Sequence, residues 1–172
     1  YGREELDRYG DTNTLDVRNG NWSLVLNTNT NTPIALQGSI RGEAAFSLAL
    51  TPIKPLVVFG ENGVSRKGAS PTASSHYLTF PRLEVAGQVT IGGRDHAVRG
   101  QAWMDHEISS SQLSAGQVGW DWLSVQFKDR RELMLYRLRR RDGSADPAST
   151  LTWIDAAGRT QRAPFTWEVL SR

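Results

Sequence analysis

The chain has 172 residues, a length that suits one domain of ordinary size, and its 20 basic and 18 acidic side chains give a formal net charge of +2. Charges of both signs are interspersed, so the composition does not indicate nucleic acid as a partner. The chain has no cysteine, which excludes disulfides and thiolate metal sites, and no apolar run approaches the roughly 20 residues of a transmembrane segment.

The N-terminal part of the sequence is polar and charged. It opens at Tyr1 with neither an initiating methionine nor a signal peptide, so we expect a mature or excised portion of a longer protein. Residues 3–8 are one of two helical candidates, and residues 109–113 are the other. Both are too short to be stable without tertiary support, so little helix is expected.

Most of the remaining sequence alternates apolar and polar residues at period two, the pattern of half-buried strands. Turn-forming residues that tolerate positive φ separate these runs. The runs are residues 23–26, 45–50, 83–91 and 120–127, and the turns are residues 18–20, 91–94, 141–143 and 157–158. The sequence therefore predicts an all-β fold of antiparallel strands, a barrel or a sandwich.

Two stretches between these runs are expected to be loops. Residues 27–33 are too polar to be buried and predict an exposed hairpin loop. Residues 51–75 carry three prolines and three glycines around the apolar run 56–59. They predict a long loop with one short edge strand, and loops of this length often serve as lids or mouths of sites.

The richest stretch for chemistry is residues 100–122 (GQAWMDHEISSSQLSAGQVGWDW). If residues 99–107 form a strand, Trp103, Asp105 and Glu107 share one face. If residues 120–127 form a strand, one face is mixed and could be the wall of a cavity. That mixed face consists of Trp120, Trp122, Ser124 and Gln126. The alternative is that these tryptophans belong to the core, with their indole N–H groups bonded to nearby carboxylates.

Asp105 and His76 are the candidate titratable groups. A carboxyl desolvated among indoles could act as a general acid, whereas a carboxylate that accepts backbone N–H bonds in a turn would be structural. His76 shares an apolar strand face with Leu78 and Phe80, where either a structural or a functional role is open. His106 points away from Asp105 by strand parity.

Other kinds of site have weaker support in the sequence. The histidines lack any recognisable metal-ligand spacing, so no metal is expected. No G-x-S-x-G motif is present, and nothing in the sequence calls for a serine hydrolase. The basic cluster of residues 137–141 is expected to be a solvated strand end rather than an anion site.

Several motifs together resemble those of the AttH family, which is grouped with carotenoid 1,2-hydratase (hydroxyneurosporene synthase) among lipocalin-like proteins. The resemblance spans about residues 48–144. The motifs are residues 52–55 (PIKP), 60–68 (GENGVSRKG), 74–77 (SSHY), 100–107 (GQAWMDHE), 109–111 (SSS), 119–122 (GWDW) and 132–139 (ELMLYRLR).

This resemblance implies a lipocalin-like antiparallel β fold, usually two related domains in a longer chain. The 172 residues would then be one lipocalin-like domain, with a second domain of the same chain as partner. The resemblance also implies a bacterial protein that is periplasmic or secreted and that binds a hydrophobic small molecule.

In the hydratase branch, an aspartate two positions after an aromatic residue is implicated in protonating a carbon–carbon double bond. Trp103 and Asp105 stand at that place, and His76 matches a histidine of an earlier strand, while Leu78 replaces a tryptophan. The implied activity is a cofactor-free hydration with Asp105 as proton donor and His76 as its positioning partner. The implied substrate-binding residues are Trp103, Trp120, Trp122, Tyr77 and Ser124. A non-catalytic lipid-binding module and, more weakly, a hydrolase are the alternatives.

Overall fold

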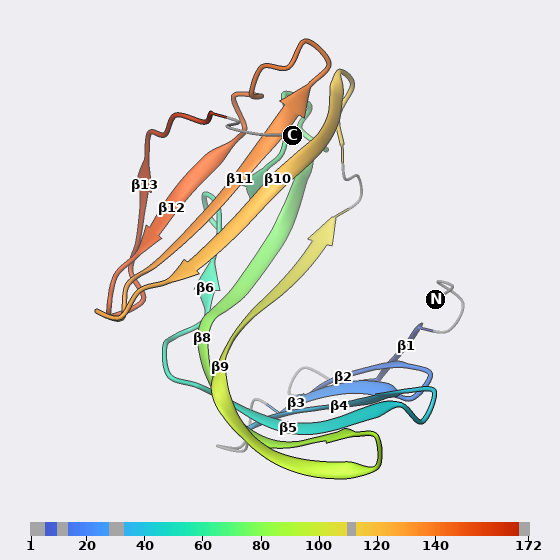
Figure 1. The fold of residues 1–172 in the computed structure, drawn as a ribbon. Coiled ribbons are helices and arrows are strands. Elements are labelled where there is room, and N and C mark those ends of the chain that lie inside the picture. The colour runs from blue at the N-terminus through green and yellow to red at the C-terminus, as the bar shows by residue number, and fades with distance from the viewer. Residues whose placement is uncertain (1–5, 10–13, 28–32, 110–112, 169–172) are drawn as a thin grey trace. The chain divides into compact units, whose positions relative to one another are not determined.

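The computed structural model describes residues 6–9, 14–27, 33–109 and 113–168, and it is all-β (Figure 1). Every strand pairing given a register is antiparallel, so the predicted fold class is confirmed.

The described residues form no helix, and residues 6–8 of the first helical candidate lie in a strand instead. Residues 110–112 of the second candidate lie outside the described residues. No helix long and apolar enough to cross a membrane occurs in this part of the chain.

The described residues form a succession of strands, as the period-two runs predict. They are β1 (Leu6–Tyr9), β2 (Thr14–Asn19), β3 (Trp22–Asn27), β4 (Ile34–Ile40), β5 (Ala44–Pro52), β6 (Val57–Val58), β7 (Ser65–Arg66), β8 (Ser74–Ile91), β9 (Arg94–Ser109), β10 (Gln117–Gln126), β11 (Glu132–Arg140), β12 (Thr150–Ile154) and β13 (Thr160–Ala163).

These strands form two sheets. The larger has the order β1-β2-β3-β4-β5-β8-β6, with β7 and β9 also paired to β8, and the smaller has the order β10-β11-β12-β13. Figure 1 shows β8 in green and β9 in yellow as the long strands of the middle of the chain. β3 and β4 are antiparallel neighbours. Residues 28–32 of the predicted hairpin loop lie outside the described residues.

The chain divides into two compact units. Unit 1 comprises residues 1–53 and 82–102, and unit 2 comprises residues 54–81 and 103–172. Both β8 and β9 contribute residues to each unit. In unit 1, the rings of Trp22 and Phe46 meet edge to face with centroids 5.1 Å apart. Gly38 lies directly beneath them, where a Cβ atom would be 2.8 Å from the Trp22 indole.

Unit 2 has a core of buried side chains from β6, β8, β11, β12 and the segment that follows β6. Its buried members are Val57, Phe59, Tyr77, Met134, Tyr136, Leu138 and Ile154, and Trp103 and Ala148 pack against them. A buried ion pair adjoins this core, with Lys54 Nζ 2.5 Å from Glu132 Oε2. The same ammonium group donates to the carbonyl oxygens of Arg130 and Asp155, so all three of its N–H groups have acceptors.

The predicted loop 51–75 contains two short strands paired to β8 rather than one, and its ends belong to β5 and β8. The predicted edge strand at 56–59 corresponds to β6, and β7 was not predicted. Gly60 makes the turn between them possible, since its φ is +91° and a Cβ atom there would lie 2.1 Å from the Val64 carbonyl oxygen. The segment thereby delivers the residue after β7, Lys67, to the interior of unit 2.

Candidate functional site

The site is built on the alternating side chains of β8. Ser75, Tyr77 and Thr79 are buried on one face, whereas His76 between them is exposed. Side chains of β9 meet the buried face: Ser75 Oγ donates to Glu107 Oε1 at 2.6 Å, and Tyr77 donates to Asp105 Oδ2 at 2.9 Å.

Asp105 is the acceptor at the centre of a hydrogen-bond network. Thr79 Oγ1 and Trp103 Nε1 both donate to its Oδ1, the indole at 2.8 Å, in addition to the Tyr77 bond. Trp122 Nε1 of β10 donates to the Tyr77 hydroxyl at 3.0 Å. The two indoles also meet edge to face, with ring centroids 6.3 Å apart. Trp103, Asp105 and Glu107 therefore share a face, as the strand pattern predicted.

The expectation of a desolvated Asp105 is wrong. The residue is exposed, because among the described strands β9 pairs only with β8 and so leaves its other edge open. Its carboxyl oxygens accept from a phenol, a hydroxyl and an indole.

Tyr77 is the buried titratable group of this network. Burial raises the pKa of its hydroxyl well above the usual range, and the neighbouring Asp105 charge raises it further. The phenol is therefore neutral near pH 7, accepts from Trp122 and donates to Asp105.

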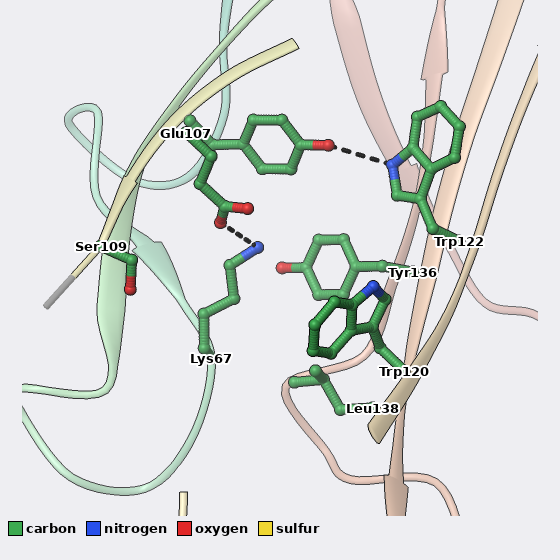
Figure 2. A pocket seen from close by; sticks show the side chains of 8 residues that line it. Lys67, Glu107, Ser109, Trp120, Trp122, Tyr136 and Leu138 are labelled. Carbon is green, nitrogen blue, oxygen red and sulfur yellow. Dashed lines mark hydrogen bonds and ion pairs between the residues drawn. The ribbon is translucent and has the colours of Figure 1, made fainter. Parts of the chain in front are cut away.

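A cavity of about 200 Å³ adjoins this network in unit 2 (Figure 2). It is lined by Lys67, Tyr77, Glu107, Ser109, Trp120, Trp122, Tyr136 and Leu138. Figure 2 shows the two tryptophans, Tyr136 and Leu138, from β10 and β11, facing Lys67, Glu107 and Ser109. One wall is thus largely aromatic and apolar, and the opposite wall is polar.

Lys67 is the pocket residue that the sequence interpretation missed. Its Nζ lies 2.9 Å from Glu107 Oε1, and 4.0 Å and 4.7 Å from the ring centroids of Tyr136 and Tyr77. These rings stabilise the buried ammonium by cation–π attraction. Gln117 fixes the backbone there by donating to the Lys67 carbonyl oxygen at 2.6 Å. The only sequence signal was its position within the motif 60–68, because a lysine in a polar loop usually faces solvent.

The predicted substrate-binding residues separate into three groups. Tyr77, Trp120 and Trp122 line the pocket. Trp103 contacts Asp105 and Trp122 without being part of the lining. Ser124 is half-buried further along β10 and is not part of the lining.

The structure does not bring His76 to Asp105. His76 points to the opposite face of β8, where its Nδ1 lies 2.9 Å from the Gly63 carbonyl oxygen. Because side chains alternate along a strand, Tyr77 and Thr79 occupy the positions that face Asp105. The resemblance matched His76 and Leu78 to a histidine and a tryptophan of the hydratases. On β8 these two positions alternate with Tyr77 and Thr79, so they do not lie on the face that meets Asp105.

Arg137 and Arg140 of the basic cluster at residues 137–141 form ion pairs with nearby aspartates. Arg137 Nη1 lies 3.1 Å from Asp121 Oδ2, and Arg140 Nε lies 3.0 Å from Asp146 Oδ2. Across the residues that the structure describes, no three His, Cys, Asp or Glu side chains gather as a metal ion would require.

A comparison with protein families assigns the chain to a family. The AttH-like family model matches residues 3–171. The chain belongs to the AttH-like family. The match extends well beyond residues 48–144, on which the resemblance rested.

A solved AttH-like structure is similar over most of this chain. It is the crystal structure of a candidate AttH protein from Nitrosomonas europaea, with 34% sequence identity and a TM-score of 0.78, and the match covers 86% of this chain and 45% of that chain. The structure of kievitone hydratase from Nectria haematococca shares the fold, with 12% identity, a TM-score of 0.59 and coverage of 92% of this chain and 58% of that chain.

A curated relative matches a shorter part of the chain. The ceramide-binding protein SVF1 from Debaryomyces hansenii is 23% identical over 99 residues, which are 56% of this chain and 26% of that protein. The AttH-like chain therefore spans less than two thirds of the length of each of these relatives.

Proposed function

We propose that this AttH-like chain binds a hydrophobic or amphipathic small molecule, of the lipid or isoprenoid class, in the pocket of unit 2. The observation that carries the proposal is the exposed aromatic wall: 47% of the Trp120 surface and 41% of the Trp122 surface are accessible beside Tyr136 and Leu138. Large aromatic side chains left uncovered in a concave site are typical of ligand pockets.

The size of the cavity and one relative support a lipid. A volume of about 200 Å³ is below the roughly 300–1,000 Å³ of pockets that enclose a whole drug-sized molecule, so it suits one end of a longer ligand. SVF1 is a ceramide-binding protein, and its match to this chain makes lipids the first class to test. A periplasmic or secreted location is part of this proposal, and cell fractionation tests it.

The direct test is mass spectrometry of small molecules extracted from the purified protein. We expect a lipid or isoprenoid to be recovered from the wild type and to be depleted in the double variant Trp120→Ala, Trp122→Ala. Trp167→Ala is the matched control, because Trp167 is 41% exposed and lies outside the pocket lining. Equal recovery from both variants would place the ligand elsewhere or make its binding nonspecific.

Hydration of a carbon–carbon double bond is a second candidate function, which the arrangement around Tyr77 favours. Tyr77 lines the pocket and donates to Asp105, so the Asp105 carboxyl adjoins the cavity. In this candidate a protonated Asp105 carboxyl transfers its proton to one alkene carbon, and the carboxylate that remains takes a proton from the water that adds to the other carbon. The carbocation that protonation forms would be stabilised by the indole faces of the wall. The proton taken from water returns Asp105 to its acid form after each turnover, and the reaction requires no cofactor.

Incubation with isoprenoid alkenes in heavy-oxygen water tests the hydratase. We expect labelled alcohol from the wild type, none from Asp105→Asn, and unchanged turnover in His76→Ala because His76 faces away from Asp105. Turnover that depends on His76 would show that its side chain reaches the reacting atoms. If ligand binding is retained and no label is incorporated, the chain acts as a non-catalytic lipid-binding module.

A further inference from the structure

The charges that face the pocket are few and unbalanced. Among the lining residues, Lys67 is the cation and Glu107 is the anion, and they neutralise each other at 2.9 Å. Asp105 adds a second negative charge just behind Tyr77. Asp121 pairs with Arg137 and Arg139, and these three residues belong to neither the lining nor this network. The described part of the site therefore has a net negative charge.

The hydrogen-bonding capacity left for a ligand is also unbalanced. Glu107 Oε1 already accepts from Ser75 and Lys67, while no described residue donates to Oε2, and 37% of this side chain is exposed. Lys67 has only 10% of its side chain exposed and is enclosed by two phenol rings and its carboxylate partner. A ligand thus meets a free acceptor rather than a free cation.

Trp120 provides the complementary group. Trp120 is 47% exposed and lines the pocket, and no acceptor for its Nε1–H occurs among the described residues. An indole N–H donates only. A headgroup that both donates and accepts could therefore bond Glu107 and Trp120 at once.

From these charges and free groups we propose that the pocket selects an amphiphile with an uncharged headgroup carrying a donor, a hydroxyl or an amide, that bonds Glu107 Oε2. This inference rests on the proposed lipid binding and specifies its ligand class. A carboxylate headgroup would face the net negative charge and would have to displace Glu107 from Lys67. A quaternary ammonium is attracted by the net negative charge but has no N–H to donate to Glu107 Oε2.

A headgroup series with one chain length tests this selection. Decanol, decanamide, decanoate and decyltrimethylammonium are titrated at pH 8 into the wild-type protein, with intrinsic tryptophan fluorescence as the readout. We expect decanol and decanamide to bind at least about tenfold more tightly than decanoate, because its charge has the same sign as that of the site. We also expect them to bind more tightly than decyltrimethylammonium, because that headgroup has no hydrogen to donate to Glu107 Oε2. Equal or tighter binding of a charged amphiphile overturns the headgroup inference but leaves the proposed lipid binding intact. If no amphiphile binds and no lipid is extracted, the proposed function fails with it.

The Glu107→Gln variant tests the assigned acceptor. Its amide oxygen can still accept from Ser75 and Lys67, but the negative charge is gone. We expect decanoate to bind roughly tenfold more tightly than to the wild type. Glu84→Gln is the matched control, because Glu84 is an exposed residue of β8 outside the pocket, and it should keep the wild-type preference. An unchanged preference in Glu107→Gln would overturn the assignment.

Discussion

Tyr77 is the residue that links the two walls of the candidate site. Its hydroxyl accepts from Trp122 on β10 and donates to Asp105 on β9, and its ring contacts the Lys67 ammonium and Phe59. One side chain thus takes part in the hydrogen-bond network, the cation–π contacts and the core of unit 2. We therefore expect the Tyr77 hydroxyl to contribute to the stability of unit 2.

Replacement of Tyr77 by phenylalanine removes this oxygen and keeps the ring. Trp122 loses its acceptor and Asp105 loses one donor, so we expect the free energy of unfolding to fall by about 1–3 kcal/mol, the usual cost of leaving polar groups unpaired. Urea denaturation followed by circular dichroism measures it. Tyr136→Phe is the matched control and should have a smaller effect, because the Tyr136 hydroxyl has only long contacts, 3.3 Å to Ser65 and 3.5 Å to Arg66. Equal losses in both variants would contradict the assigned role.

The raised pKa of Tyr77 also makes stability depend on alkaline pH. Below the usual tyrosine pKa of about 10, the phenol is protonated in both the folded and the unfolded state, and its contribution to stability is complete. At higher pH the unfolded state releases the proton and the folded state retains it, so the free energy of unfolding falls. We expect the stability difference between wild type and Tyr77→Phe to shrink between pH 9 and pH 11 in urea denaturation. A constant difference would show that the Tyr77 hydroxyl titrates alike in both states.

Strand parity explains which site residues could be predicted from sequence. Period two placed Trp103, Asp105 and Glu107 on one face and His106 on the other without knowledge of any partner. The exposure of Asp105 could not be predicted in the same way, because it depends on β9 lacking a described neighbour beyond β8. The role of Lys67 requires two aromatic rings from distant strands, and no local pattern contains that information.

At the level of elements, long alternating strands were predictable and short paired ones were not. Runs such as 83–91 show the period-two alternation in their own side chains, and they lie in strands. β6 and β7 have two residues each and exist because they pair with β8, at Val57 with Thr79 and at Ser65 with Ser75. A strand of two residues is too short to show a period, so its pairing partner defines it.

The segment that carries β6 and β7 is anchored to the smaller sheet by the buried Lys54–Glu132 pair, whose side chains are 1% and 0% exposed. Lys54→Met would remove the ammonium partner of the buried Glu132 carboxylate, so we expect a loss of about 3–5 kcal/mol in the free energy of unfolding. The double variant Lys54→Met, Glu132→Leu should regain part of this loss, since no charge remains buried. Lys128→Met, at an exposed position, is the control. Urea denaturation of the four proteins measures these differences, and additive losses in the double variant would rule out coupling.

At the scale of the whole molecule, the AttH-like assignment and the antiparallel β fold agree with the sequence interpretation, which required motifs spread over half the chain rather than one site. The single lipocalin-like domain with a second domain in the same chain stays a prediction. The division into units matters for function, because every residue that lines the aromatic pocket belongs to unit 2. Binding should therefore leave the side chains of unit 1 unaffected.

Tryptophan fluorescence can test this location, because the two units carry separate indoles. Trp22 lies in unit 1 against Phe46, and Trp120 and Trp122 line the pocket of unit 2. We expect decanol to change the emission of the wild type and of Trp22→Phe by the same amount. In the double variant Trp120→Phe, Trp122→Phe, the change in emission should be less than half of the wild-type change. Saturation at about 100 times the dissociation constant should also raise the free energy of unfolding by about 2.7 kcal/mol, since the ligand binds only the folded state. A signal that disappears with Trp22 would place the ligand in unit 1, and the pocket assignment would then be wrong.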